Sequence, residues 1–94
     1  MMRNVKLFKA NLKRQVKRKH ELEERLDDLR GKWKQPELSY QQQRAIERDG
    51  EMIKDEIQNL TAYIAKAERA IRNWFSVSDS EIKALTDFKY WKRA

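Results

Sequence analysis

The chain has 94 residues, which suits one small domain, and a formal net charge of +7 from 22 lysines and arginines against 15 acids. It has no cysteine, which excludes a disulfide framework and a thiolate zinc site. Only 39% of the residues are apolar, and two glycines and one proline leave little material for turns. We therefore expect an all-α protein with few connections rather than strands joined by tight hairpins.

The first predicted helix covers about residues 2–34. Its apolar residues recur every three or four positions, so they share one stripe at 100° per residue, with Val16 at its edge. Gly31 weakens the last turn, and Pro36 prevents the helix from continuing. The stripe consists of Val5, Phe8, Leu12, Leu22, Leu26, Leu29 and Trp33.

Two polar residues, Gln15 and Lys19, occupy positions on this stripe where leucine or isoleucine would be expected. One interpretation is that the lysine stem packs against apolar neighbours while its ammonium reaches water. The other is a buried polar pair that fixes the register or the oligomeric state at a cost in stability. We favour the first interpretation.

A turn at residues 35–38 leads to the second predicted helix, about residues 39–75. Ser39 and Gln42 have the spacing of a capping box, while Gly50 is a weak point that could kink the helix. Because the connection is short, the first two helices must fold back into a long antiparallel, coiled-coil-like hairpin. The second stripe consists of Ile46, Ile53, Ile57, Leu60, Ile64, Ala67, Ile71 and Trp74.

The third predicted helix is short and covers about residues 79–92. Ser78 and Glu81 have the spacing of a capping box at its start. We expect this helix to fold onto the open end of the hairpin, near residues 1–12, so that residues 1–94 form a single helical domain. A two-helix hairpin leaves one side of each stripe wet, and pairing into a four-helix arrangement would bury it. The sequence therefore also predicts a homo-oligomer, with a homodimer as the simplest form.

The positive charge is concentrated at one end of the chain. Residues 1–20 carry +8 with no acid, whereas residues 21–94 sum to −1. On a helical wheel most of these cations lie opposite the apolar stripe, and such a ridge can follow a phosphate backbone. An ordinary solvated face and an acidic protein partner are the alternative interpretations. The candidate cations are Arg3, Lys6, Lys9, Lys13, Arg14, Lys17 and Arg18.

Part of this charge is expected to be neutralised inside the hairpin. The outer face of the first helix turns acidic after residue 20. In an antiparallel pair its basic part lies beside Asp55 and Glu56, and its acidic part beside Arg44 and Arg48. Cross-helix ion pairs of this kind fix register and orientation.

The end of the sequence mixes cations with aromatic rings. Lys89, Lys92 and Arg93 could extend a polyanion-binding surface. Tyr90 and Trp91 are adjacent and cannot both face inward, so at least one is expected to contact a partner.

Catalysis has little support in this sequence. His20 is the only histidine and lies among cations, and there is no metal-ligand spacing and no glycine-rich phosphate loop. We therefore expect no enzymatic activity, no cofactor, no metal and no small-molecule substrate. No apolar run approaches the ~18 residues that a transmembrane helix needs, and we expect a cytoplasmic location.

The function that these patterns favour is that of a non-enzymatic binding protein, associated with nucleic acid through the basic face of its first helix. The alternative is a protein-directed adaptor or inhibitor, such as an accessory protein of a phage or mobile element. It would dock an acidic protein surface through the same basic face and the aromatic, basic tail. A third option is a purely structural coiled-coil spacer.

Overall fold

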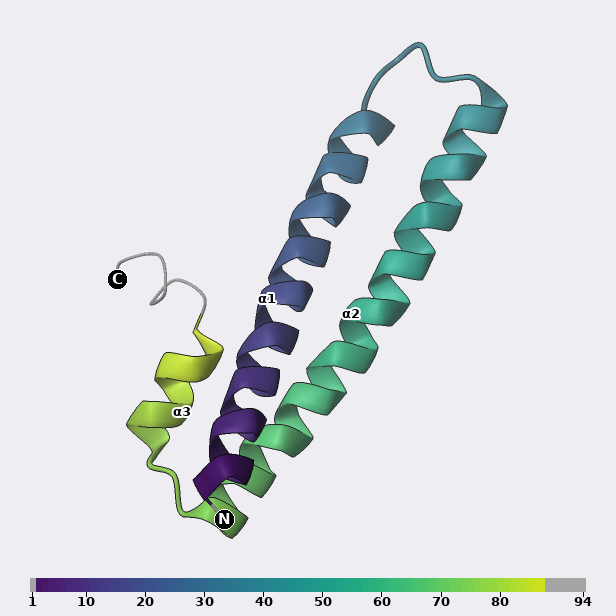
Figure 1. Ribbon diagram of the computed structural model, residues 1–94. Helices are drawn as coiled ribbons and strands as arrows, with labels where there is room; N and C mark the ends of the chain where they lie inside the picture. The colour runs from purple at the N-terminus through teal and green to yellow at the C-terminus, as the bar shows by residue number, and fades with distance from the viewer. Residues whose placement is uncertain (1, 88–94) are drawn as a thin grey trace.

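The computed structural model describes residues 2–87, with side chains from residue 5 onward. Over these residues it contains three helices and no strand: α1 (Met2–Trp33), α2 (Tyr40–Phe75) and α3 (Asp79–Thr86). The first two helices lie side by side and antiparallel, and α3 lies beside the end of the hairpin that holds the N-terminus (Figure 1). The prediction of an all-α protein, built as a long helical hairpin with a short third helix, is confirmed.

The capping signals place the start of α2 where the sequence predicts it. Ser39 is the N-cap in an extended conformation, and its hydroxyl accepts a hydrogen bond from the backbone N–H of Gln42 at 3.2 Å. The Gln42 side chain accepts one in return from the Ser39 N–H at 2.9 Å. The helix passes through Gly50 without a break and ends at Phe75; the C-cap Ser76 adopts a left-handed conformation with φ of 53°.

The third helix is shorter than predicted. Its N-cap is Ser78, whose hydroxyl accepts a hydrogen bond from the Glu81 N–H at 3.3 Å. The helix ends at Thr86, because Asp87 is extended, with φ of −94° and ψ of 100°. Threonine and aspartate are weak helix formers, and an acid is unfavourable at the negative end of the helix dipole. The rest of the predicted helix, residues 88–92, lies outside the described residues.

The core is concentrated where the three helices meet. Six of the seven buried side chains lie at that end, and Phe8 and Leu85 pack against the main cluster. The Phe8 and Phe75 rings are 5.7 Å apart and tilted by 55°. Val16 belongs to this core, which corrects the expectation that it lies at the edge of the stripe. The buried side chains are Leu12, Val16, Leu22, Ile64, Ala67, Ile71 and Ile82.

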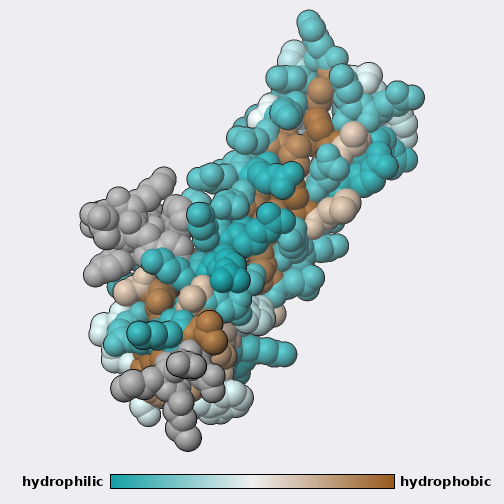
Figure 2. All heavy atoms as spheres, viewed as in Figure 1, coloured by the Kyte–Doolittle hydropathy of each residue, from teal (hydrophilic) through white to brown (hydrophobic). Residues whose placement is uncertain are grey.

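Toward the turn the same stripes are only half-buried. None of the side chains from residue 23 to residue 60 is buried, because two helices alone cover one side of each stripe. Apolar side chains line up between polar rims in the upper part of the molecule (Figure 2). Trp33 and Trp74, both predicted on the stripes, are 43% and 77% exposed. Each lies at the end of its helix, where the antiparallel partner helix offers only its first turn.

The two polar residues on the α1 stripe are half-buried rather than buried. Gln15 donates a hydrogen bond to the Asn11 side chain at 3.4 Å. No buried side-chain nitrogen or oxygen among the described residues lacks a hydrogen-bond partner. A half-buried Lys19 fits the interpretation in which its stem packs and its ammonium reaches water.

Candidate polyanion-binding surface

The structure shows the side chains of six of the seven N-terminal cations proposed as binding residues; that of Arg3 is outside the described side chains. The six differ in whether another helix of the same chain supplies an acid. The candidate residues of the tail, both cations and rings, lie outside the described residues. These are Lys89, Tyr90, Trp91, Lys92 and Arg93.

Lys9 faces α3 rather than solvent, which corrects its assignment to the outer face. Its Nζ lies 2.8 Å from Oε2 of Glu81, and its side chain is only 31% exposed. A helical wheel drawn for the hairpin alone places Lys9 on the outer face, because it takes no account of α3. The pair fastens the first turn of α3 to α1, so Lys9 is poorly placed to meet an external anion.

Arg18 is also engaged within the chain. Its Nη2 lies 3.2 Å from Oε1 of Glu56, and both side chains are 47% exposed. Glu56 is one of the two acids predicted to lie beside the basic part of α1. The pair crosses from α1 to α2 and matches the antiparallel register of the hairpin.

The sequence also predicts ion pairs between the acidic part of α1 and two arginines of α2, Arg44 and Arg48. The structure does not show these pairs among the residues that it describes. Arg44 lies over the ring of Tyr40, with its Cζ 5.4 Å from the ring centroid, and its Nε donates to the Tyr40 hydroxyl at 3.0 Å. Within residues 2–87, neither Arg44 nor Arg48 forms an ion pair with α1. The Tyr40 ring lies on the same helix one turn away, so it is the nearer partner for this guanidinium.

Four exposed cations lie on the side of α1 that is turned away from α2, and we call them the basic ridge: Lys6, Lys13, Arg14 and Lys17. Lys6 and Lys17 are eleven residues apart, which places them on one azimuth about 16 Å apart along the axis. Lys6, Arg14 and Lys17 form no ion pair with any other described residue. No acidic residue occurs in α1 before Glu21, so the ridge is a continuous strip of positive charge.

The ridge offers positive charge and hydrogen-bond donors. Lysine presents a mobile point charge with three donors, and arginine presents a planar fork that matches phosphate or carboxylate. None of the four residues carries the amide that reads an adenine edge. The ridge is therefore suited to contacts with a backbone of negative charges.

The structure gives no support for a catalytic or metal site within the described residues. His20 lies 3.0 Å from Oε1 of Glu24 in an exposed pair on one helix. No group of three histidine, aspartate or glutamate side chains in residues 2–87 could hold a metal ion. None of the helices in this part of the chain has the length and apolarity to cross a membrane.

Sequence reasoning missed one polar contact between the two long helices. The Asn11 amide donates a hydrogen bond to the Tyr63 hydroxyl, from α1 to α2. Asn11 and Arg18 are seven residues apart, so both cross-helix contacts lie on the same face of the hairpin. The seven-residue spacing of Asn11 and Arg18 in the sequence indicates that both can contact α2.

Comparison with models of protein families and with curated proteins gives no match to this chain. Comparison with solved structures gives no match either. The packing of the helices and the distribution of charge are therefore the observations on which a function can rest.

Proposed function

We propose that the protein binds nucleic acid through the basic ridge, as a non-enzymatic binder without sequence preference. The observation that supports this is the contrast within α1. Lys9 and Arg18 pair with acids on other helices, whereas the ridge is a strip of exposed cations with no acid beside it in the sequence. Such a strip repels itself, and a polyanion relieves that repulsion.

The expected binding energy comes from the release of counterions. Each phosphate that a cation neutralises contributes a slope of about −0.9 to log K against log salt for duplex DNA. The four ridge residues would therefore give a slope of up to about −3.6. A 16 Å strip corresponds to about five phosphates of one strand at roughly 3.4 Å each, so the spacing is compatible with all four contacts.

The test is a titration of the whole chain against labelled duplex DNA, single-stranded DNA and RNA, followed by fluorescence anisotropy at several salt concentrations. The test variant combines Lys6→Glu, Arg14→Glu and Lys17→Glu. We expect it to lose binding to all three ligands. In Lys→Gln and Arg→Gln versions, the salt slope should flatten by about 0.9 for each contact removed.

The matched control changes the same amount of charge at the other end of the molecule. It combines Lys34→Glu, Arg44→Glu and Arg48→Glu, all exposed and near the turn. We expect this control to bind more weakly only through net charge and to keep the parent's salt slope. If the control loses as much slope as the ridge variant, binding follows net charge and the ridge is not the site. A parent that binds none of the three ligands at low salt would also contradict the proposal.

An acidic protein surface is the second candidate partner. It is supported by the two ion pairs of α1 with Glu81 and Glu56, since in both a cation of this helix donates to a carboxylate. A defined polyglutamate peptide distinguishes the candidates. Binding of the peptide without binding of nucleic acid, lost in the ridge variant, would favour the adaptor.

The tail belongs to both candidates and can be tested separately. Removing residues 88–94 takes away three cations and three rings together. If the tail contributes charge alone, the full chain with Lys89→Gln, Lys92→Gln and Arg93→Gln should lose as much binding as the truncated chain. A further loss on truncation would assign a role to the rings.

A further inference from the structure

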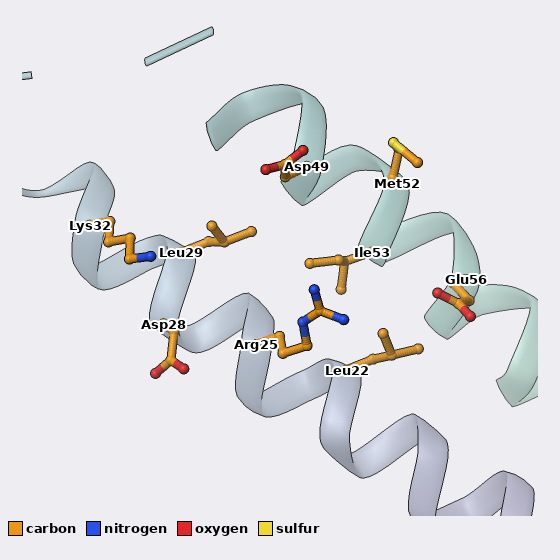
Figure 3. Close-up of a pocket in the computed structure, with 9 residues that line it drawn as sticks. All are labelled: Leu22, Arg25, Asp28, Leu29, Lys32, Asp49, Met52, Ile53 and Glu56. Carbon is orange, nitrogen blue, oxygen red and sulfur yellow. The ribbon is translucent and has the colours of Figure 1, made fainter. Parts of the chain in front are cut away.

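The half of the hairpin near the turn has an open groove between its helices. The groove has a volume of about 490 Å³, and its floor is apolar, formed by Leu22, Leu29 and Ile53. Leu29 and Ile53 point toward one another from the two helices, and Arg25 reaches from α1 toward α2 (Figure 3). Met52 stands on the rim and is 66% exposed. The stripes are therefore accessible where no third helix covers them.

This groove lies on the face of the hairpin opposite α3. Residues seven apart along a packed helix share a face. Lys9 pairs with Glu81 of α3, and its heptad continues to Arg30. Arg30 lines a different and smaller groove, of about 160 Å³, on the other side of the stripes.

The α1 residues that contact α2 on this face belong to one heptad position, and that position continues into the large groove. Asn11 and Arg18 reach α2 on this face. Seven and fourteen residues beyond Arg18 come Arg25 and Lys32, which line the groove. The groove is thus the turn-end part of one face that runs the length of the hairpin, which we call the open face.

Large apolar side chains are exposed along the open face. Met52 lines the groove, and Tyr63 makes the contact with Asn11. Leu7 shares a heptad position with Asp28 of the groove and is 69% exposed. These are three of the six large apolar side chains that are exposed within the described residues. They add to the apolar surface that the floor of the groove supplies on this face.

The two rims of the groove carry opposite net charge. The α1 rim has two cations, Arg25 and Lys32, and one acid, Asp28. The α2 rim has two acids, Asp49 and Glu56, and no cation. One rim is therefore net +1 and the other net −2, so the face is self-complementary for a partner that brings each rim against the opposite one.

We propose that a second copy of the chain covers the open face, with the two turns at the same end. A twofold axis along the hairpin sets α1 of each copy against α2 of the other, which brings Arg25 to the level of Asp49 in the second copy. An axis across the hairpin instead sets each helix against itself. The two acids of the α2 rim then face α2 of the second copy, so Arg25 does not meet Asp49. Charge therefore selects the first arrangement.

The size of the open face suffices for a stable dimer. A helix of 32 residues is about 48 Å long, and two packed helices are roughly 20 Å wide, which gives on the order of 900 Å² per copy. A standard interface needs about 800 Å² per partner. Lys6 and Lys17 of the basic ridge point away from α2, whereas Arg14 shares the heptad position of Leu7. The dimer is therefore tested at Arg25 and Asp49, which do not belong to the ridge.

The test uses two single variants of the whole chain, Arg25→Glu and Asp49→Arg, measured by sedimentation equilibrium. Neither residue forms an ion pair with another described residue, and both are exposed, so the monomer should fold unchanged. Each variant alone opposes like charges at two symmetric places, and we expect the dimer Kd to rise about tenfold. An equal mixture of the two restores opposite charges at both places and should return to the parent's Kd.

A single spin label distinguishes the two arrangements of the dimer. The chain has no cysteine, so a spin label at Lys34→Cys in the turn reports only distances between copies. Turns at the same end predict a distance of about 20–30 Å, whereas the crossed arrangement predicts about 50 Å.

The outcomes that overturn the dimer are distinct from those that overturn nucleic-acid binding. A chain that stays monomeric at the highest soluble concentration rules the dimer out. A long label distance would support the crossed arrangement and refute this one, and a dimer Kd that is unchanged in Arg25→Glu would refute this one as well. A mixture that fails to recover would place the contact on another face. Loss of nucleic-acid binding in Arg25→Glu without any change of mass would assign the open face to that ligand instead.

Discussion

The two ends of the hairpin are built from the same kind of apolar stripe but bury it to different extents. At the three-helix end, Leu12, Ile64 and Ile71 are buried beneath α3. At the two-helix end, Leu26 and Ile53 lie on the same stripes and remain half-buried. The difference is not in composition, since both ends supply leucine and isoleucine at three- and four-residue spacing. An eight-residue third helix decides which end has a core.

The comparison implies unequal local stability along a single helix pair. Free energies of local opening follow the number of buried apolar contacts, so the two-helix end should open first. The loosely closed end also has the stripes themselves to offer a partner, whereas at the three-helix end the stripes are buried. The buried core is thus confined to one end, and substitutions at equivalent positions can test that difference.

The largest expected effect comes from Leu12→Ala. Leu12 is 1% exposed, and truncating a buried leucine costs about 3 kcal/mol, which lowers the Tm of a domain of this size by roughly 15 °C. Leu26→Ala is the matched control, since Leu26 has the same heptad position but is half-buried, and it should cost about 1 kcal/mol. Thermal unfolding followed by circular dichroism, at a concentration where the chain is monomeric, measures both. Equal losses would mean that the two ends are equally packed.

The next effect compares the two serine caps. Ser78→Ala and Ser39→Ala each remove a cap worth about 1 kcal/mol. An eight-residue helix cannot persist alone, so without its cap α3 should detach and uncover Ile82. The start of α2 should merely fray, because the rest of a 36-residue helix stays packed. Hydrogen exchange should therefore show faster core exchange in Ser78→Ala only; the same pattern in both variants would contradict the assigned role of α3.

Much of the fold was predictable because its signals are local. Pro36 ends α1, and the hydroxyls of Ser39 and Ser78 start α2 and α3 where the spacing to Gln42 and Glu81 indicated. Turn length then forces the hairpin. The end of α3 was not predictable to the residue, since the sequence there has neither a glycine nor a proline to stop a helix.

The placement of side chains was less predictable because it depends on contacts distant in sequence. On a helical wheel of the hairpin alone, Lys9 lies on the outer face and Val16 at the edge of the stripe. With α3 in place, Lys9 forms an ion pair and Val16 is part of the core. The acid that pairs with Lys9 is 72 residues away. Of the candidate cations whose side chains are described, Lys6, Arg14 and Lys17 form no ion pair with either neighbouring helix, and the position of α3 was needed to show which they are.

A smaller effect, and one of opposite sign, is expected from Gly50→Ala at the two-helix end. A Cβ there would lie 4.0 Å from Cδ1 of Leu26, which is an ordinary contact. Replacing a mid-helix glycine by alanine should therefore raise the free energy of unfolding by about 0.5–1 kcal/mol. Gly31→Ala, which would meet nothing within 4 Å, is the control for helix propensity alone. Urea unfolding measures both, and a loss of stability in Gly50→Ala would show that the helices pack more closely there.

The smallest effect separates the two ion pairs that hold α1 to its neighbours. Double-mutant cycles to alanine should give couplings of about 0.3–0.5 kcal/mol for Lys9 with Glu81 and for Arg18 with Glu56, because exposed pairs are worth little. The nitrogen–oxygen distance is 2.8 Å in the Lys9 pair and 3.2 Å in the Arg18 pair, so the pair at the three-helix end should couple more strongly. At about 1 M salt the Debye length falls to roughly 3 Å, and the Arg18 coupling should fade first. A stronger and more salt-resistant Arg18 pair would show that the open face is drier than the α3 side, as it would be if a second copy already covered it in solution.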